Sequence, residues 1–359
     1  MRRELVIAGR VINDELPAYV IGEIGHNHGG SVDQAVALIV ECARAGVDAV
    51  KFQKRTNSAI YSRALLNQPY DHEHSYGPTY GAHRAALEFD VDAFRTCYQA
   101  AKTAGITAFA TAFDESAADF LMHAGSPALK IASGDLTNTP LLAYVAKMGV
   151  PIILSTGGGT LEDIDRAVET VTKHTSDLAI LHCTAAYPVH DFAELNLRVI
   201  PALRTRYSDF QIGWSGHDNG IAMSVLAYSL GARLIEKHVT RNRALKGTDH
   251  AFSLEPSGLR RMVRDLERAH IALGDGIKRV YPSEAAPLRK MRKSLVAARP
   301  MQVGQVIQNG DLLRKSPDGG IPAYQIDAVV GFTLVKPLAE DEPLTYEHLA
   351  GAESHSVAS

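Results

Sequence analysis

The chain has 359 residues and a mass of 38.8 kDa, and 46% of its residues are hydrophobic, which is enough for one large domain and a small one. A formal net charge of -3, from 37 basic and 40 acidic side chains spread along the sequence, leaves no basic stripe for nucleic acid and no polybasic membrane patch. The apolar runs are too short to span a membrane, so we expect a cytoplasmic protein without nucleic-acid or membrane partners.

Eight short apolar runs alternate with amphipathic segments along the first 275 residues. We predict strands at residues 18–24, 49–54, 107–113, 128–133, 151–156, 178–184, 211–216 and 233–240. Two of the intervening helices begin with capping-box patterns, at Ser31 with Gln34 and at Thr160 with Asp163. Strands separated by helices pair in parallel, and no G-x-G-x-x-G follows the first strand, so the pattern favours a closed (β/α)8 TIM barrel over an open dinucleotide-binding sheet.

The pattern changes after the eighth unit, which indicates a second domain. We expect a TIM-barrel catalytic domain over residues 1–275, a polar and basic linker over 276–292, a small β-rich domain over 293–351 and a disordered tail over 352–359. About 60 residues make a marginal core by themselves. The small domain is therefore expected to dock on the barrel or on a partner subunit.

Polar side chains stand near the carboxyl ends of the predicted strands, where the catalytic groups of such barrels gather. The last run, RLIEKHVT, carries Glu236, Lys237 and His238 although buried strands are usually apolar. This recurrence in every strand predicts a functional site at one mouth of the barrel. The polar residues at the strand ends are Glu23, Lys51, Gln53, Thr111, Lys130, Ser133, Ser155, Thr156, His182, Thr184, Ser215, His217 and His238.

His217 and His238 follow neighbouring strands, which would bring two imidazoles within reach of one ion. A divalent metal with two histidine ligands and open positions is a Lewis acid for a carbonyl oxygen. The alternative is a pair of hydrogen-bonded structural histidines. Cys42, Cys97 and Cys183 lack metal-type spacing and are expected to be reduced core thiols, although Cys183 lies near the predicted site.

Two lysines and several hydroxyl groups form a second cluster of predicted site residues. Lys51 and Lys130, with the neighbouring serine and threonine hydroxyls, suit a bound phosphate or carboxylate. Alternatively, the lysines balance the charges of Glu23, Asp135 and Glu236. Glu23 and Asp135 are in either case candidate acids or bases.

The connection from Arg55 to Phe89 is too long for a plain barrel loop and is typical of a lid or binding loop. It contains His72, His74 and His83. Their spacing matches no ligand pattern, so we expect these histidines to be solvated rather than to bind a metal.

Several motifs occur together in order: IGEIGHNHGG, AVKFQK, YGAHRAALEF, LKIASGDLTNTPLL, ILSTGGGTLEDI, LHCTAAYP, SGHDNGIAMSVLAYSLGARLIEKHVT and SLEPSGLRRMV. Over roughly residues 15 to 350 the chain resembles the sialic acid synthases, which are nonulosonate synthases that condense phosphoenolpyruvate with an amino sugar such as N-acetylmannosamine. The C-terminal segment resembles their antifreeze-like, or SAF, domain.

The resemblance implies a barrel that binds phosphoenolpyruvate and Mn²⁺ or Mg²⁺, and a swapped homodimer in which the partner's SAF domain covers the site. It assigns the metal to His217 and His238, and contact with the metal or the sugar acceptor to Glu23, Gln53, Tyr187 and Asp249. The residues assigned to phosphoenolpyruvate are Lys51, Thr111, Lys130, Ser133, Ser155 and Ser215.

Three positions depart from the family's pattern. Asp135 replaces a glutamate proposed to handle the attacking water, Ala185 replaces an asparagine that contacts phosphoenolpyruvate, and Ser316 replaces an arginine that reaches the acceptor's N-acetyl group. Loss of a charged, multi-donor contact is not a conservative change. We therefore expect an acceptor other than plain N-acetylmannosamine, or one that is held differently.

Two other functions fit the same residues. A class I aldolase would form a Schiff base at Lys51, Lys130 or Lys237. A sugar-binding protein without activity would keep the fold while the changes at Asp135 and Ala185 disable the chemistry. Borohydride trapping identifies the first of these, and phosphoenolpyruvate binding without turnover identifies the second.

Overall fold

The computed structural model describes residues 3–351, so the predicted disordered tail lies outside the described residues. The chain divides into two compact units between Gly274 and Asp275. Each unit is described by itself. No helix among the described residues is both long and apolar enough to cross a membrane.

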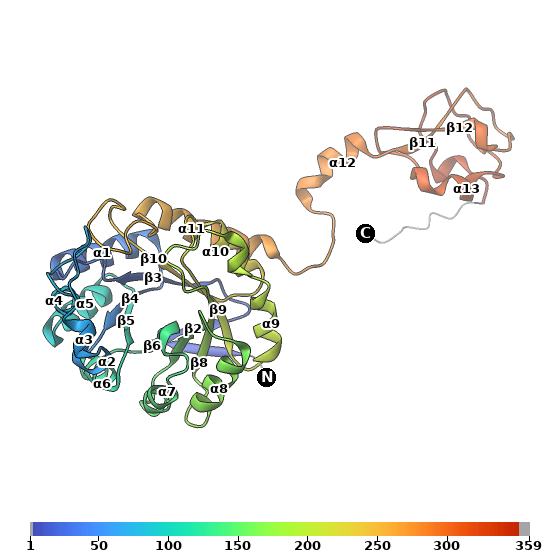
Figure 1. Cartoon of the computed structure of the whole chain (residues 1–359). Helices are drawn as coiled ribbons and strands as arrows, with labels where there is room; N and C mark the ends of the chain where they lie inside the picture. Colours follow the sequence, from blue (N-terminus) through green and yellow to red (C-terminus); the bar gives the residue numbers. More distant parts are fainter. Residues whose placement is uncertain (1–2, 352–359) are drawn as a thin grey trace. The chain divides into compact units, whose positions relative to one another are not determined.

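The first unit is a closed barrel of eight parallel strands, with helices around it (Figure 1). The strands follow one another around the barrel in chain order, and β10 closes it by pairing with β3. This confirms the predicted TIM barrel, and each predicted strand coincides with a barrel strand whose ends differ from the prediction by at most two residues. Ser133 belongs to a 3-10 turn rather than to β6. The barrel strands are β3 (Tyr19–Gly25), β4 (Ala49–Lys54), β5 (Thr107–Ala112), β6 (Leu129–Ile131), β7 (Ile152–Ser155), β8 (Leu178–Cys183), β9 (Gln211–Gly216) and β10 (Leu234–His238).

The outer helices form where the amphipathic segments predict them, and several of them are capped at the N-terminus by a side chain. Thr160 and Asp163 form the complete capping box at the start of α8. At the start of α1 only half of the predicted box forms, because Ser31 accepts from the Gln34 N–H without the reciprocal bond. The helices of this layer are α1 (Val32–Ala45), α5 (Val91–Thr103), α6 (Glu115–Ala124), α7 (Thr139–Val145), α8 (Leu161–Thr172), α9 (Val199–Arg206), α10 (Ala222–Ser229) and α11 (Pro256–Leu273).

An N-terminal hairpin that the strand prediction missed precedes the barrel. Its strands β1 (Glu4–Ile7) and β2 (Arg10–Asn13) are joined by Ala8 and Gly9, which both have positive φ as a two-residue hairpin turn requires. Leu5, Ile7 and Ile12 are buried in one cluster with inward-facing residues of the barrel strands. The hairpin therefore packs against the apolar part of the barrel interior.

The barrel interior changes from apolar to polar along each strand. Residues two apart on a strand face the same side, so each inward-facing column is visible in the sequence. The buried apolar residues Ile21, Ala49, Phe109, Ile153 and Leu234 are each followed, two positions later, by a cavity-lining polar residue. Those polar residues are Glu23, Lys51, Thr111, Ser155 and Glu236. The polar ends of the strands thus share the interior of the barrel with its apolar part.

The long connection after β4 folds into three short helices, α2 (Asn57–Ile60), α3 (Arg63–Leu66) and α4 (Tyr80–Ala86). The expectation that its histidines are solvated is wrong for His83, which is buried in α4 and packs against Tyr70 with ring centroids 4.6 Å apart. Its Nδ1 accepts a hydrogen bond from the Tyr76 N–H at 3.1 Å. Tertiary packing within the connection accounts for its burial.

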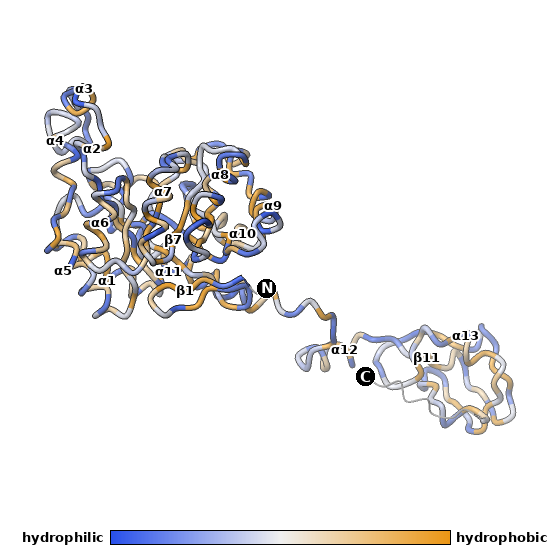
Figure 2. The backbone as a smooth tube through the Cα atoms, turned by 90° about the horizontal axis from the view of Figure 1, so that it is seen from below, coloured by the Kyte–Doolittle hydropathy of each residue, from blue (hydrophilic) through white to orange (hydrophobic). Residues whose placement is uncertain are grey.

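The second unit has a hydrophobic core of its own. It contains α12 (Ala285–Met291), the antiparallel strands β11 (Ser294–Ala297) and β12 (Leu312–Lys315), and the short helix α13 (Ile326–Val329). Leu295, Met301, Leu334 and Leu344 are buried in this core. Figure 2 shows hydrophobic stretches, in orange, in both units of the chain.

Candidate active site

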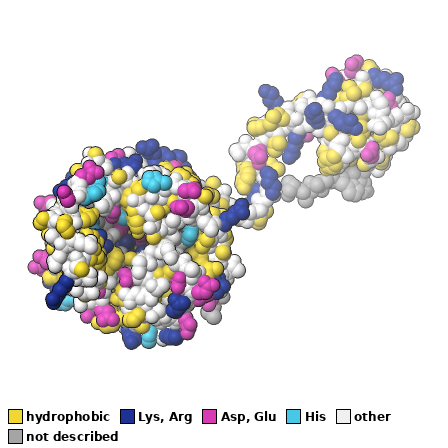
Figure 3. Space-filling model, in the orientation of Figure 1, with side chains coloured by type: hydrophobic (Ala, Val, Ile, Leu, Met, Phe, Trp, Pro, Cys, Tyr) yellow, Lys and Arg dark blue, Asp and Glu magenta, His cyan; other side chains and the backbone are white. Residues whose placement is uncertain are grey.

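The polar strand ends line one cavity of about 520 Å³ in the barrel unit, where the space-filling view is hollowed (Figure 3). Of the residues to which sequence analysis gave a catalytic, substrate-binding or metal-binding role, all except Asp135 line this cavity. The prediction was wrong for three other strand-end residues, Thr156, His182 and Thr184, which do not line it. The residues brought together are Glu23, Lys51, Gln53, Thr111, Lys130, Ser133, Ser155, Tyr187, Ser215, His217, His238 and Asp249. Asp135 faces a neighbouring cavity, where its carboxylate accepts a hydrogen bond from the Asn138 side chain at 3.1 Å.

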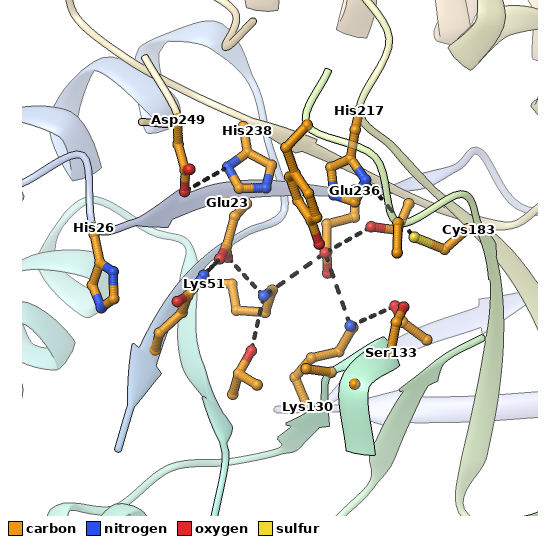
Figure 4. A pocket seen from close by; sticks show the side chains of 18 of the residues that line it. Glu23, His26, Lys51, Lys130, Ser133, Cys183, His217, Glu236, His238 and Asp249 are labelled. Atoms are coloured by element: carbon orange, nitrogen blue, oxygen red, sulfur yellow. Dashed lines mark hydrogen bonds and ion pairs between the residues drawn. The ribbon is translucent and has the colours of Figure 1, made fainter. Parts of the chain in front are cut away.

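Two buried lysines and two buried carboxylates form the centre of the site (Figure 4). Lys51 Nζ lies 2.8 Å from Glu23 Oε2 and 3.7 Å from Glu236 Oε1. Lys130 Nζ lies 3.9 Å from the same Glu236 oxygen, which also accepts a hydrogen bond from Ser215 at 3.0 Å. Glu236 therefore bridges the two lysines, and each ammonium group has a carboxylate partner.

The two carboxylates differ in acidity because their surroundings differ. Burial raises the pKa of Glu23 to about 7, and the like charge of Glu236 adds to the rise against the opposing effect of Lys51. Burial also acts on Glu236, but Lys130, Lys51 and the Ser215 hydrogen bond outweigh it and lower its pKa to about 2. Glu236 is thus a fixed negative charge, while Glu23 exchanges a proton near neutral pH.

Each lysine also donates to a hydroxyl on the next strand. Lys51 Nζ donates to Thr111 Oγ1 at 2.9 Å, and Lys130 Nζ donates to Ser155 Oγ at 2.6 Å. Burial lowers the pKa of Lys130, with a further contribution from Lys51. A cluster of ammonium and hydroxyl donors in a buried cavity is suited to an anion that brings its own negative charge.

His217 and His238 lie beside this centre with their ring centroids 5.3 Å apart. Burial lowers the pKa of each to about 3, and each imidazole is therefore neutral. His217 Nδ1 lies 3.0 Å from the Thr184 carbonyl oxygen, so this nitrogen carries the proton and leaves Nε2 with a lone pair. His238 Nδ1 is buried without a hydrogen-bond partner and lies 3.7 Å from Asp249 Oδ2.

This donor set fits a divalent transition metal in part. Two neutral imidazoles, one oriented by a backbone carbonyl and one with an unpartnered buried nitrogen, are the ligands such an ion accepts. Among residues 3–351, no three His, Cys, Asp or Glu side chains converge closely enough to enclose an ion. The two histidines would therefore hold the ion with water or substrate oxygens at its other positions.

Comparison with known proteins identifies the family. The model of the NeuB family matches residues 38–278, and the model of the SAF domain matches residues 292–350. The chain belongs to the NeuB family. It is 36% identical over 340 residues to the N-acetylneuraminate-9-phosphate synthase of Homo sapiens, with 94% of each chain covered.

Two other proteins are similar to this chain over most of its length. The N,N'-diacetyllegionaminic acid synthase of Campylobacter jejuni is 35% identical, with 90% of this chain and 97% of that protein covered. The crystal structure of the N-acetylneuraminic acid (sialic acid) synthetase of Leptospira borgpetersenii is 32% identical with a TM-score of 0.70, covering 80% of this chain and 96% of that one. The chain is accordingly an enzyme of the transferase class, of the sialic and nonulosonic acid synthase kind.

The three positions that sequence analysis expects to depart from the family's pattern lie in three separate surroundings. Ala185 lines the cavity and offers it a methyl group in place of an amide. Burial raises the pKa of Asp135, which lies in the neighbouring cavity beyond Gly134. Ser316 lies in the second unit, where its hydroxyl donates to the Met291 carbonyl at 2.9 Å.

Of the three ionisable residues Glu236, Lys237 and His238 in β10, only Lys237 does not face the cavity. Glu236 and His238 line the cavity, and the residue between them points to the opposite face of β10. There Lys237 Nζ lies 2.9 Å from Asp218 Oδ1, and both side chains are 1% exposed. This lysine is part of a buried ion pair, and it is not available for a Schiff base in the cavity.

Sequence reasoning missed several residues of the cavity wall. His26, Arg55, Arg84 and Thr248 line the cavity, and Glu236 was considered only as a balancing charge. The period-2 column from Leu234 would have placed Glu236 inside the barrel. Arg84 lies in α4, within the long connection, and no strand periodicity could have placed it at the site.

Proposed function

We propose that this enzyme condenses phosphoenolpyruvate with an open-chain aldose, giving a sialic-acid-type 2-keto-3-deoxy nonulosonate and phosphate. The observation that carries the proposal is the pairing of two subsites in one cavity. A buried cluster of lysine and hydroxyl donors, centred on Lys51 and Lys130, adjoins a pair of neutral histidines, His217 and His238. The first subsite suits a small dianion, and the second suits the activation of a carbonyl group.

Phosphoenolpyruvate is assigned to the lysine subsite. Lys51 and Lys130 lie on either side of Glu236, so their charges are held apart by a carboxylate that stays ionised. The hydroxyls of the subsite add neutral donors that orient a phosphate or carboxylate without further charge. These hydroxyls belong to Thr111, Ser133, Ser155 and Ser215.

The aldose is assigned to the side of the cavity lined by Glu23, Gln53, Tyr187 and Asp249. Gln53 Nε2 donates to Glu23 Oε1 at 2.7 Å, which fixes the carboxyl group toward the cavity. The Tyr187 ring is 55% exposed and lies over His217 with ring centroids 4.1 Å apart. An exposed aromatic ring beside buried carboxylates offers both an apolar face and hydrogen-bond acceptors to a sugar.

The reaction balances with these groups. The methylene carbon of phosphoenolpyruvate attacks the aldehyde carbon, and the aldehyde oxygen takes a proton from Glu23, whose raised pKa keeps it partly protonated near pH 7. Water adds to the resulting oxocarbenium carbon and returns a proton to Glu23. The new hydroxyl then forms the ketone, its proton passes to phosphate, and phosphate leaves with the bridging oxygen through C–O cleavage.

His217 and His238 would hold the divalent cation, Mn²⁺ or Mg²⁺. When bound, the cation would supply Lewis-acid polarisation of the aldehyde. The remaining task belongs to the chain itself, because the lysines orient the enolpyruvate anion beside the acceptor.

The acceptor is proposed to differ from plain N-acetylmannosamine, or to be held differently. Ala185 removes one donor from the cavity wall, and Ser316 cannot supply the charged contact of an arginine. Asp135 would need to reach the cavity past Gly134 to act on water. A panel in which N-acetylmannosamine were the best acceptor would refute this part.

The SAF domain is proposed to cover the site of a partner subunit in a domain-swapped homodimer, and the enzyme to act in the cytoplasm. The small unit exposes apolar side chains, including Val303 at 60% and Tyr324 at 75% exposure. Such side chains are suited to burial against another surface. We propose residues 1–275 as the catalytic domain, 276–292 as the linker and 293–351 as the SAF domain.

Phosphate release from phosphoenolpyruvate tests the function. The purified protein is incubated with Mn²⁺ and a panel of 2-acylamino and plain hexoses, with and without EDTA. We expect release that depends on both the acceptor and the metal. Tight phosphoenolpyruvate binding without release, for every acceptor of the panel, would contradict the proposal and favour a sugar-binding protein.

A further inference from the structure

Two arginines converge on one histidine at the wall of the cavity, apart from the lysine centre. Arg55 Nη1 lies 2.9 Å from His26 Nε2, and Arg84 Nη1 lies 3.5 Å from His26 Nδ1. All three residues line the cavity. Figure 4 shows His26 on the side of Glu23 that is away from His217. We call Arg55, Arg84 and His26 the arginine cluster.

The arginine cluster carries positive charge without a matching carboxylate. Among residues 3–351, no carboxylate oxygen lies within 4.0 Å of a side-chain nitrogen of Arg55 or Arg84. Glu88 approaches Arg55 only through the backbone N–H, and its Oε2 pairs with Lys54 at 3.1 Å. Arg55 is 8% exposed, and its Nε is buried without a hydrogen-bond partner. Burial of an uncompensated cation is costly, which indicates that the cluster is built for an anion.

The hydrogen bonds of the arginine cluster also leave one donor too many. Burial and the neighbouring arginines lower the pKa of His26 well below its usual range, so the ring is neutral. A neutral imidazole accepts at one nitrogen and carries a proton on the other. Both nitrogens of His26 nevertheless face a guanidinium N–H. One of these contacts therefore places donor against donor, and an added acceptor would relieve it.

Aromatic residues hold both guanidinium groups in place. Arg55 lies over the Phe113 ring, 3.8 Å from its centroid. Arg84 Nε donates to the Tyr80 hydroxyl at 2.9 Å, and its guanidinium lies 5.0 Å from the centroid of that ring. Planar guanidinium groups fixed in this way present paired N–H donors, the geometry that binds phosphate in bidentate fashion. The cluster is preorganised rather than dependent on ligand-induced ordering.

A row of hydrogen bonds connects the arginine cluster with the proposed acceptor side of the cavity. Arg55 Nη2 donates to Gln53 Oε1 at 2.6 Å, and Gln53 Nε2 donates to Glu23 Oε1 at 2.7 Å. The lysine centre, which is assigned to phosphoenolpyruvate, has its own carboxylates. An anion bound at the arginine cluster would therefore belong to the second substrate.

We propose that Arg55, Arg84 and His26 bind a phosphate monoester on the aldose acceptor. This inference rests on the proposed function, because it places the acceptor beside Gln53 and Glu23. A phosphate dianion balances two guanidinium charges, whereas a carboxylate balances one. The aldehyde end of the sugar is assigned to His217 and His238, and His26 lies on the side of Glu23 away from His217 (Figure 4). The proposed phosphate is therefore on the terminal hydroxyl of the sugar, at the end remote from the aldehyde.

The ratio of kcat/KM for a 2-acylamino hexose 6-phosphate to that for the unphosphorylated sugar tests the assignment. The variants are Arg55→Gln and Arg84→Gln, and the matched control is Arg63→Gln, an exposed arginine of the same connection. The wild type is expected to prefer the phosphorylated sugar. Each cluster variant should lower the ratio at least about tenfold, as expected for the loss of a charged hydrogen bond, and the control should not change it. An unchanged ratio in both cluster variants would overturn the proposal.

A binding measurement separates this inference from the proposed function. Titration calorimetry follows the binding of the hexosamine 6-phosphate in the absence of phosphoenolpyruvate, with the unphosphorylated sugar as the comparison. Binding that is weakened in Arg55→Gln and Arg84→Gln supports the arginine cluster even if no acceptor is condensed. Condensation of unphosphorylated sugars, with sugar phosphates bound no more tightly, would overturn the cluster and leave the proposed function intact.

Discussion

The buried ion pair on the outer face of β10 gives a prediction with a defined magnitude. Lys237 Nζ lies 2.9 Å from Asp218 Oδ1 and 2.6 Å from the Asp218 carbonyl oxygen. It also lies over the Trp214 ring, 5.5 Å from the centroid. The perturbation is Lys237→Met, which keeps much of the side-chain volume but leaves the Asp218 carboxylate buried without its partner.

The expected cost follows from what each substitution leaves behind. Removal of one partner of a buried pair costs about 3–5 kcal/mol, because the remaining charge is uncompensated. Adding Asp218→Leu removes that charge. The backbone carbonyl of residue 218 still lacks the donor that Lys237 supplied, and this unmade hydrogen bond costs about 1–3 kcal/mol. The double variant is thus expected to be about 2 kcal/mol more stable than Lys237→Met alone.

Urea unfolding followed by tryptophan fluorescence measures this coupling. The chain has one tryptophan, Trp214, which is 1% exposed in β9 next to Lys237 and reports on the barrel unit. Arg166→Met is the matched control, since Arg166 pairs with Asp163 at 2.9 Å while 55% exposed, and should cost less than about 1 kcal/mol.

Two results would refute the reasoning about Lys237. If the double variant were as unstable as Lys237→Met, the carboxylate would not be the source of the cost. If the folded double variant lost borohydride trapping with a carbonyl substrate, Lys237 would be a Schiff-base lysine and the enzyme a class I aldolase. We expect the double variant to retain acceptor-dependent phosphate release.

Three further predictions concern the site and its surroundings. Lys130→Met should lower kcat/KM for phosphoenolpyruvate by about 100-fold or more, because a buried cation that donates to the substrate is lost. Steady-state kinetics measure this, and a change in the KM of the acceptor alone would refute it. EDTA should abolish activity, and Mn²⁺ should restore it. His217→Ala and His238→Ala should each weaken the binding of Mn²⁺, as measured by electron paramagnetic resonance. Unchanged Mn²⁺ binding in both variants would show that these histidines are not the metal ligands. Burial lowers the pKa of His28 to about 4, from a value near 6.5 in the unfolded chain. Between these two pH values the unfolded chain binds a proton that the folded chain does not. The free energy of unfolding therefore falls as the pH falls through that window. His28→Asn, which keeps an acceptor for the Gly30 N–H, should flatten this slope by up to about 1.4 kcal/mol per pH unit in urea unfolding, and an unchanged slope would contradict it.

The barrel was predictable because each of its strands carries a local signal. Inward-facing columns such as Ile21 with Glu23 repeat every two residues, and helical segments separate the strands. The first hairpin was missed because β1 and β2 have four residues each, too few to establish a period. Its burial depends on contacts with the distant barrel strands, which no local pattern contains.

The site was predictable where it lies on strands and not where it lies on connections. Gln53 and His238 close strands, so topology alone brings them together. Asp135 sits in a 3-10 turn after β6, and the turn directs its carboxyl group to the neighbouring cavity. Arg84 reaches the cavity from α4 through the fold of the long connection, which sequence spacing does not determine.

The fate of the bridging oxygen of phosphoenolpyruvate tests the central claim most directly. Phosphoenolpyruvate labelled with heavy oxygen at the bridge is incubated with the enzyme, Mn²⁺ and the best acceptor of the panel, and the phosphate is analysed by mass spectrometry. Condensation through C–O cleavage predicts labelled phosphate, formed only when the acceptor is present. Unlabelled phosphate, or labelled phosphate released equally without any acceptor, would contradict it.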